Sequence, residues 1–104
     1  MKNYIFKMWH YGVSHNKMLL RSVHDGWNTD ICFLDVKYIE LPTVLRGITI
    51  LEPSQTDVEY LSDIIDIKDE RITVILSQGK RYYVVSSIVK VIENELDLFE
   101  LPYE

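Results

Sequence analysis

Short stretches in which apolar and polar residues alternate, separated by turn-forming residues, constrain this chain more than any other feature. The clearest stretch spans residues 29–41, TDICFLDVKYIEL, and it ends at Pro42, which cannot donate a hydrogen bond to a neighbouring strand. A period of two predicts a β-strand, because successive side chains of a strand point to opposite faces of a sheet. Asp35 and Lys37 are predicted to lie on one face. The other face is predicted to be apolar without a break, and it consists of Cys32, Leu34, Val36 and Tyr38.

A second alternating stretch covers residues 3–11, NYIFKMWHY. Its alternation places Lys7, Trp9 and Tyr11 together on one face of a predicted strand. The opposite, mainly apolar face is predicted to point inward and consists of Tyr4, Phe6, Met8 and His10.

Turn signals separate the remaining predicted strands. Residues 12–16 are rich in turn formers, and the Asp25–Gly26 pair is a strong turn signal, so a strand is predicted between them. A short strand is predicted over residues 48–52. A hairpin with its turn at Gln78–Gly79 is predicted over residues 70–87, and residues 88–93 continue its second strand or add another.

One segment is compatible with a helix. Thr56 followed by Glu59 fits a capping box, and Val58, Leu61 and Ile65 recur at helical spacing, which predicts a short helix over residues 56–65. An irregular or strand-like segment is the alternative. The chain contains no alanine, the best helix former, and is rich in valine, isoleucine and threonine, which suit a pleated surface.

These patterns predict a mainly β protein. The 104 residues form one domain by length, with a compact antiparallel sheet of about six or seven strands curled into a small barrel or folded into a two-layer sandwich. An α+β fold is the alternative. No apolar run approaches the roughly 20 residues that span a bilayer, and residues 1–12 do not resemble a signal peptide. With Cys32 as its single cysteine, the chain is expected to be cytoplasmic and not to bind a membrane.

Residues 8–22, MWHYGVSHNKMLLRS, contain the residue types of an active site. Three histidines and Cys32 are present in the chain, but the spacing of His10, His15 and His24 fits no common zinc pattern. Ser14 and His15 are adjacent, and adjacent side chains on a turn diverge, so they do not predict a catalytic dyad. We therefore expect no metal, no cofactor and no catalytic residue.

Carboxylates and glycines offer little more. The acids around Asp63 and Asp66 form a charge run of the kind that usually faces solvent, and four scattered glycines make no phosphate-binding loop. Asp35 is the best candidate for a buried acid with a raised pKa, because its strand is otherwise apolar. An outward-facing Asp35 is the simpler interpretation.

Four large side chains remain: Trp9, Tyr11, Arg21 and Trp27. Tryptophan, tyrosine and arginine are enriched at binding hot spots, but they are also common where a sheet packs on itself. If the first two strands pair as a hairpin, Arg21 is expected to lie near Trp9 and Tyr11. Core packing and recognition both remain open for these residues.

Charge is distributed in zones along the chain. Residues 1–51 carry a net charge of +2, residues 52–70 of −6, residues 71–90 of +4 and residues 91–104 of −5. The last zone interleaves its acids with apolar residues, so segment 93–104 is expected to pack on the domain, on a second copy or on a partner. An acidic chain disfavours nucleic-acid binding and suits a basic protein partner.

The leading hypothesis is a small, non-catalytic protein-binding module, such as an inhibitor or immunity-type protein that neutralises a basic partner. The residues predicted to contact that partner are Trp9, Tyr11, Arg21, Trp27, Asp63, Asp66, Glu95, Asp97 and Phe99. A ligand-binding or catalytic site in the mouth of a β-barrel is one alternative, lined by Trp9, Tyr11, His15, Arg21 and Asp35. A homo-oligomeric structural protein is another.

Overall fold

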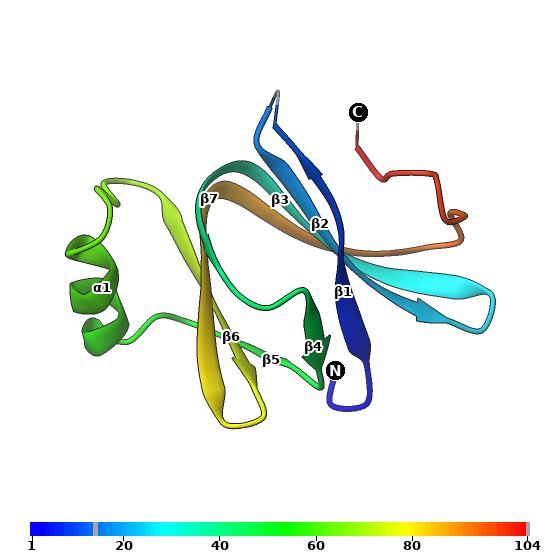
Figure 1. Cartoon of the computed structure of the whole chain (residues 1–104), viewed down its shortest axis with the longest axis horizontal. Helices are drawn as coiled ribbons and strands as arrows, with labels where there is room; N and C mark the ends of the chain where they lie inside the picture. Colours follow the sequence, from blue (N-terminus) through cyan, green and yellow to red (C-terminus); the bar gives the residue numbers. More distant parts are fainter. Residues whose placement is uncertain (14, 104) are drawn as a thin grey trace.

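A computed structural model describes residues 1–13 and 15–103 of the chain; Ser14, considered above as part of a dyad, and Glu104 lie outside the described residues. Seven strands form one antiparallel sheet in the order β4-β1-β2-β3-β7-β6-β5, which curls into a half-barrel (Figure 1). The predicted mainly β fold, its strand number and its single short helix are confirmed. The elements are β1 Ile5–Gly12, β2 Lys17–His24, β3 Trp27–Glu40, β4 Val44–Arg46, β5 Thr49–Leu51, α1 Gln55–Ser62, β6 Arg71–Ser77 and β7 Lys80–Asn94.

Two tight turns lie where the sequence predicts them. β2 ends at His24 and β3 begins at Trp27, so Asp25 and Gly26 form a two-residue connection. Gln78 and Gly79 connect β6 to β7, and both have positive φ, at +50° and +77°. Positive φ at both central residues is the geometry whose twist matches that of two antiparallel strands. These turns therefore set the registers of both hairpins.

A bulge in β1 changes the predicted faces of that strand. Met8 pairs with Leu20 and His10 with Leu19, which leaves Trp9 as an extra residue. An extra residue reverses the alternation beyond it. His10 therefore lies on the face opposite to Met8, and Tyr11 no longer shares a face with Lys7. The predictions for His10 and Tyr11 are wrong for this reason.

A second bulge interrupts β3. The register shifts between Val36 and Tyr38, and Asp35 just before it has a positive φ of +55°. The predicted apolar face of Cys32, Leu34, Val36 and Tyr38 is wrong, because the alternation reverses at Asp35 and again at the register shift after Val36. Val36 packs in the main core together with the odd-numbered Ile31 and Phe33, whereas Cys32 and Leu34 lie on the opposite face. Asp35 is exposed, so it is not the buried acid considered above.

The curl of the sheet encloses the main core, and α1 covers a second one on the other side of β6 and β7. The buried members of the main core are Phe6, Met18, Leu20, Ile31, Phe33, Val36, Leu45, Ile48, Ile75 and Val84. Those of the second core are Leu61, Ile72, Val74, Tyr83 and Val85. Because β7 contributes Val84 to one core and Val85 to the other, its centre is apolar on both faces, as a buried strand requires.

The helix begins earlier than predicted and uses a different cap. Ser54 Oγ accepts a hydrogen bond from the Asp57 N–H at 3.2 Å, and the Asp57 carboxylate accepts one from the Ser54 N–H at 2.8 Å. This reciprocal pair is a capping box with the same spacing as Thr56 and Glu59, two residues nearer the N-terminus. The helix ends at Ser62, so Ile65 packs on the second core from beyond it.

The two acidic zones lie far apart. The molecule measures 41 × 32 × 18 Å, with α1 near one end of its longest axis and the C-terminal residues near the other (Figure 1). Residues 52–70 and 93–103 therefore do not form one acidic surface. In the described part of the chain, no helix has the length and apolar character needed to cross a membrane.

Candidate functional site

One face of the sheet carries buried side chains that belong to neither core. We call it the outer face, meaning the side of β1, β2 and the first half of β3 that points away from the main core. Arg21 pairs across the strands with Asp30, and Leu19 pairs with Cys32. All four side chains are buried, although they point away from the core residues that precede and follow them. Another part of the chain must therefore cover them.

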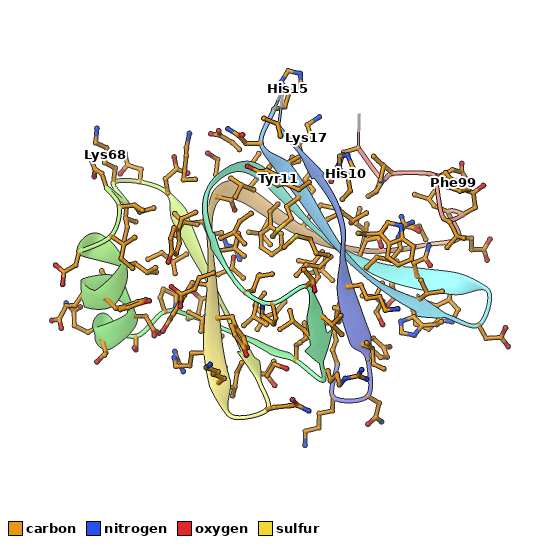
Figure 2. The ribbon with its side chains drawn as sticks, viewed as in Figure 1. His10, Tyr11, His15, Lys17, Lys68 and Phe99 are labelled. Carbon is orange, nitrogen blue, oxygen red and sulfur yellow. The ribbon has the colours of Figure 1, made fainter. Side chains whose placement is uncertain are left out.

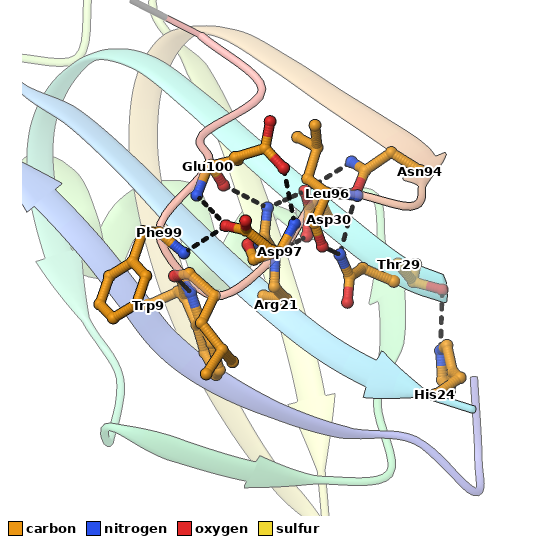
Figure 3. Close-up of polar contacts among 12 residues, drawn as sticks. Trp9, Arg21, His24, Thr29, Asp30, Asn94, Leu96, Asp97, Phe99 and Glu100 are labelled. Carbon is orange, nitrogen blue, oxygen red and sulfur yellow. Dashed lines mark hydrogen bonds and ion pairs between the residues drawn. The ribbon is translucent and has the colours of Figure 1, made fainter. Parts of the chain in front are cut away.

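That cover is residues 95–103, which we call the C-terminal segment. It leaves the end of β7 and crosses β3 and β2 toward β1, held by side chains of the sheet that donate to its main-chain carbonyls (Figure 3). These bonds join Asn28 Nδ2 to the carbonyl of Leu96 at 2.8 Å, Arg21 Nη1 to that of Asp97 at 3.0 Å, Trp9 Nε1 to that of Leu98 at 3.1 Å and Arg21 Nη2 to that of Glu100 at 3.1 Å. The segment is thus held through its backbone.

An ion pair lies beneath this segment. The Arg21 guanidinium donates to both carboxylate oxygens of Asp30, at 2.7 and 2.9 Å. Asn94 Nδ2 donates to the same carboxylate at 2.7 Å, and the ring of Trp9 covers the guanidinium carbon at 5.6 Å. A buried charge is costly unless it is paired and hydrogen-bonded. Asp30 neutralises Arg21, so the pair offers donors to the segment without adding a net charge.

The far end of the segment is anchored at β1 and β2. The Tyr103 hydroxyl lies 2.9 Å from His10 Nδ1, and the ammonium of Lys17 lies 5.4 Å from the centre of the Tyr103 ring. Burial raises the pKa of the Tyr103 hydroxyl above its ordinary value. Burial also raises the pKa of the Cys32 thiol to about 11, with a further contribution from Asp30. Cys32 is therefore a protonated, covered thiol at neutral pH.

A pocket opens between the C-terminal segment and the sheet. Its volume is about 270 Å³, and its lining residues are Trp9, Arg21, Val23, His24, Gly26, Trp27, Asn28, Glu95, Leu96, Asp97 and Leu98. The ring of His24 stacks between those of Tyr4 and Trp27, with centres 4.2 and 4.0 Å apart. This stack fixes the aromatic wall of the pocket.

A second hollow adjoins the first on the side of β1. Its volume is about 390 Å³, and it is lined by Ile5, Lys7, Trp9, Arg21, Val23 and Leu98. The two hollows share Trp9, Arg21, Val23 and Leu98. We call the two together the tail groove. Its floor is the outer face, and one wall is the C-terminal segment.

A turn in the C-terminal segment holds two apolar side chains away from the sheet. Asp97 Oδ1 accepts hydrogen bonds from the N–H groups of Phe99 and Glu100, at 2.9 and 3.1 Å, and Glu100 Oε1 accepts one from the Asp97 N–H at 3.1 Å. Leu98 is 61% exposed and Phe99 is 92% exposed. The Asp97 side chain therefore shapes the segment, and Phe99 projects into solvent.

The structure brings most of the predicted contact residues together. Trp9, Arg21, Trp27, Glu95 and Asp97 line one pocket, and Phe99 follows directly on the same segment. Tyr11 lies apart, near the tip of the β1–β2 hairpin (Figure 2). Asp63 and Asp66 line a separate hollow of about 530 Å³ beside α1, at the far end of the molecule.

The residues of the ligand-site alternative do not gather in the same way. Of its five members, only Trp9 and Arg21 are in contact. His15 is exposed in the connection between β1 and β2, and Tyr11 lies nearby (Figure 2). Asp35 lies at the bulge of β3, where hydrogen bonds from Ser87 and then Lys37 hold the pKa of its carboxyl below the ordinary value. Among the residues that the structure describes, no three histidine, cysteine or acidic side chains cluster as metal ligands would.

A separate polar network fastens α1 to the sheet. The Asp57 carboxylate accepts hydrogen bonds from the Arg81 guanidinium and, at 2.8 Å, from the Tyr83 hydroxyl. Arg81 is the main reason that the pKa of Asp57 lies well below its usual range. Glu40 accepts from Tyr38 and Tyr60 at 2.6 and 2.7 Å, and the first bond raises the pKa of Tyr38 to about 12. The bonds of Asp57 to β7 and of Tyr60 to Glu40 on β3 attach the helix to the sheet.

Asp30, Asn28 and Asn94 are residues of the site that the sequence patterns did not identify. A signal for Asp30 was present: a two-residue turn at Asp25–Gly26 places His24 opposite Trp27, and counting back along both strands places Arg21 opposite Asp30. No comparable signal exists for Asn28 and Asn94: Asn28 donates to Asn94 and to a main-chain carbonyl, and Asn94 donates to Asp30 from a strand that is distant in the sequence. No protein-family model, curated protein or solved structure matches this chain.

Proposed function

We propose that this protein is a non-catalytic protein-binding module whose partner docks on the tail groove. The observation that carries the proposal is the convergence of Trp9, Arg21, Trp27, Glu95 and Asp97 on one pocket from three strands and the C-terminal segment. Aromatic and arginine side chains around a desolvated hollow are typical of the centre of a binding interface. The surface is also fixed in advance, because the buried ion pair and four hydrogen bonds hold the segment.

Apolar side chains around the groove supply contact area. Ile5 and Val23 are exposed beside it, and Leu98 and Phe99 project from its wall. A phenylalanine that is 92% exposed adds no stability to the isolated fold. Burying it against a partner contributes about 2 kcal/mol to the free energy of binding. The partner is expected to insert an apolar side chain into the hollow and to cover Phe99.

The acids of the C-terminal segment favour a basic partner. Glu95 lines the groove and is exposed, and Glu100 is exposed on the same segment, whereas the charge of Arg21 is balanced by Asp30. Lys7 is the basic side chain on the opposite rim. Complementary charge raises the rate of encounter and suppresses wrong partners. Small acidic inhibitors and immunity-type proteins that neutralise a basic toxin are examples of this class, by analogy of size and charge.

Affinity capture with matched variants tests this function. Phe99→Ser removes the exposed apolar side chain that follows Leu98 at the edge of the groove, and Ile64→Ser removes an exposed apolar side chain beside α1 at the other end of the molecule. We expect wild type and Ile64→Ser to retain the same basic protein from the source cells, and Phe99→Ser to lose it. Retention should also weaken at high ionic strength. A protein retained equally by all three baits, or lost only with Ile64→Ser, would contradict the proposal.

A further inference from the structure

The second half of β7 has a neighbouring strand on one side only. β7 pairs with β3 from Tyr83 to Asn94, but it pairs with β6 only as far as Ser86 (Figure 1). In the described part of the chain, no strand lies beside residues 87–94 on the side of β6. We call these residues the open edge. At about 3.4 Å per residue, the open edge is roughly 27 Å long.

The open edge is apolar as well as unpaired. Ile88 and Ile92 are exposed on the outer face of the sheet, because they pair with Leu34 and Asp30, and Val91 is 52% exposed on the opposite face. Half of the main-chain groups of an edge strand point away from its only neighbour. A long edge of β-branched residues is a template for another strand.

We propose that two copies of this chain pair through their open edges, as antiparallel strands related by a two-fold axis. Pairing would satisfy the outward main-chain groups of both edges and would cover Ile88, Val91 and Ile92. It would also join the two half-barrels into one continuous sheet. The inference is independent of the proposed function, because the tail groove lies on the face of the sheet and not on this edge.

Symmetry and charge select the register of this pairing. A two-fold axis perpendicular to the sheet keeps each residue on the face of the sheet that it already occupies. In an antiparallel pair of identical strands related by such an axis, the residue at the axis lies opposite the same residue of the second copy. An axis at residue 90 would place the two Lys90 ammonium groups opposite each other, which is unfavourable. An axis at residue 91 places Val91 against its own copy and Lys90 against the second copy's Ile92. We therefore expect the register centred on Val91.

Charge also favours a second copy at this edge. The chain carries a net charge of −5, so two copies repel each other over most of their surface. The open edge contains Lys90 and Glu93 and is neutral. At its start, the Ser87 hydroxyl lies 2.6 Å from an Asp35 carboxylate oxygen, to which it donates, and 3.0 Å from one of Glu70. Lys37 pairs with Asp35, and Arg71 follows Glu70 directly in the chain. Electrostatic repulsion between two copies of this acidic chain is therefore weak when they meet at the open edge.

Sedimentation of the full chain and two matched variants tests this inference. Val91→Lys and Val23→Lys change side chains that are 52% and 54% exposed, and they alter the net charge by the same amount. We expect wild type and Val23→Lys to sediment as dimers. Val91→Lys should raise the dimer dissociation constant by about 100-fold, because it places two ammonium groups opposite each other. A monomeric wild type, or a dimer that withstands Val91→Lys, would overturn the inference.

Hydrogen exchange locates the interface. Amides of residues 87–94 that point away from β3 should exchange more slowly as the concentration of wild-type protein rises, and they should exchange fast in Val91→Lys. Slowing that appears elsewhere instead, or dissociation caused equally by Val23→Lys, would place the contact between copies on another surface and reject the open edge.

Discussion

Arg21 and Asp30 show at the residue scale how the outer face is organised. Each is buried, and each neutralises the other through two hydrogen bonds. The remaining donors of Arg21 reach the carbonyls of Asp97 and Glu100, so one side chain connects the second strand to the end of the chain. A lysine at this position would lack the planar fork that makes these contacts together.

Removing one member of this pair should cost more than removing both. Arg21→Met leaves the Asp30 carboxylate buried without its counter-charge, and we expect the free energy of unfolding to fall by about 3–5 kcal/mol. Arg21→Met combined with Asp30→Leu leaves neither charge and should recover most of this loss. Urea denaturation of the wild type, both single variants and the double variant measures the coupling. Losses that simply add in the double variant would show that the two charges do not act as a pair.

At the scale of elements, a single carboxylate caps α1 and attaches it to the sheet. Asp57 completes the capping box with Ser54 and accepts hydrogen bonds from Arg81 and Tyr83 on β7. The helix has only eight residues, fewer than an isolated helix needs in water. Its stability therefore depends on the cap and on packing against the second core.

Loss of this carboxylate should destabilise the protein in a pH-dependent manner. Asp57→Asn is expected to lower the free energy of unfolding by about 2 kcal/mol at neutral pH, the usual size for hydrogen bonds to a charged group. Because the Arg81 guanidinium holds the folded-state pKa of Asp57 below its unfolded value, this stabilisation is complete above about pH 4 and is lost as the pH falls further.

Urea titrations of wild type and Asp57→Asn at several pH values measure this effect. The difference in unfolding free energy between the two proteins should be constant above about pH 4 and should shrink steadily from there toward about pH 2. A difference that stays constant over this range would show that the charge of Asp57 is not what attaches the helix.

The strands were predictable to the extent that they depend on local pattern. Residues 29–41 and the turns at Asp25–Gly26 and Gln78–Gly79 were identified from alternation and turn chemistry alone. The faces of β1 and β3 were not, because an extra residue at Trp9 reverses the alternation in β1, and the positive φ of Asp35 and the register shift after Val36 reverse it in β3. The position of such a bulge depends on how the whole sheet curls, and the curl cannot be predicted from the sequence of one strand.

The candidate site was predictable in its residue types and not in its assembly. Aromatic and arginine enrichment identified Trp9, Arg21 and Trp27. The C-terminal segment reaches them through main-chain carbonyls, and a carbonyl has no sequence signature. The acids of residues 63 and 66 were assigned to the same surface because charge runs in a sequence do not show how far apart they fold.

At the scale of the whole molecule, three surfaces are kept apart. The acidic zone around α1 lies at one end, the tail groove at the other, and the open edge of β7 on the rim of the sheet (Figure 1). A dimer formed through two open edges therefore leaves both grooves uncovered. Such a dimer would present two copies of the groove to partners, and linked copies raise apparent affinity without any new contact.

The tail groove exists only when residues 95–103 are docked across the outer face. Nuclear magnetic resonance of the full-length protein tests this most directly, through the indole N–H of Trp9, which donates to the Leu98 carbonyl at 3.1 Å. We predict slow exchange of that proton and cross-relaxation between it and protons of residues 97–99. Fast exchange, with random-coil shifts and no cross-peaks to β1 or β2 from residues 95–103, would contradict the account.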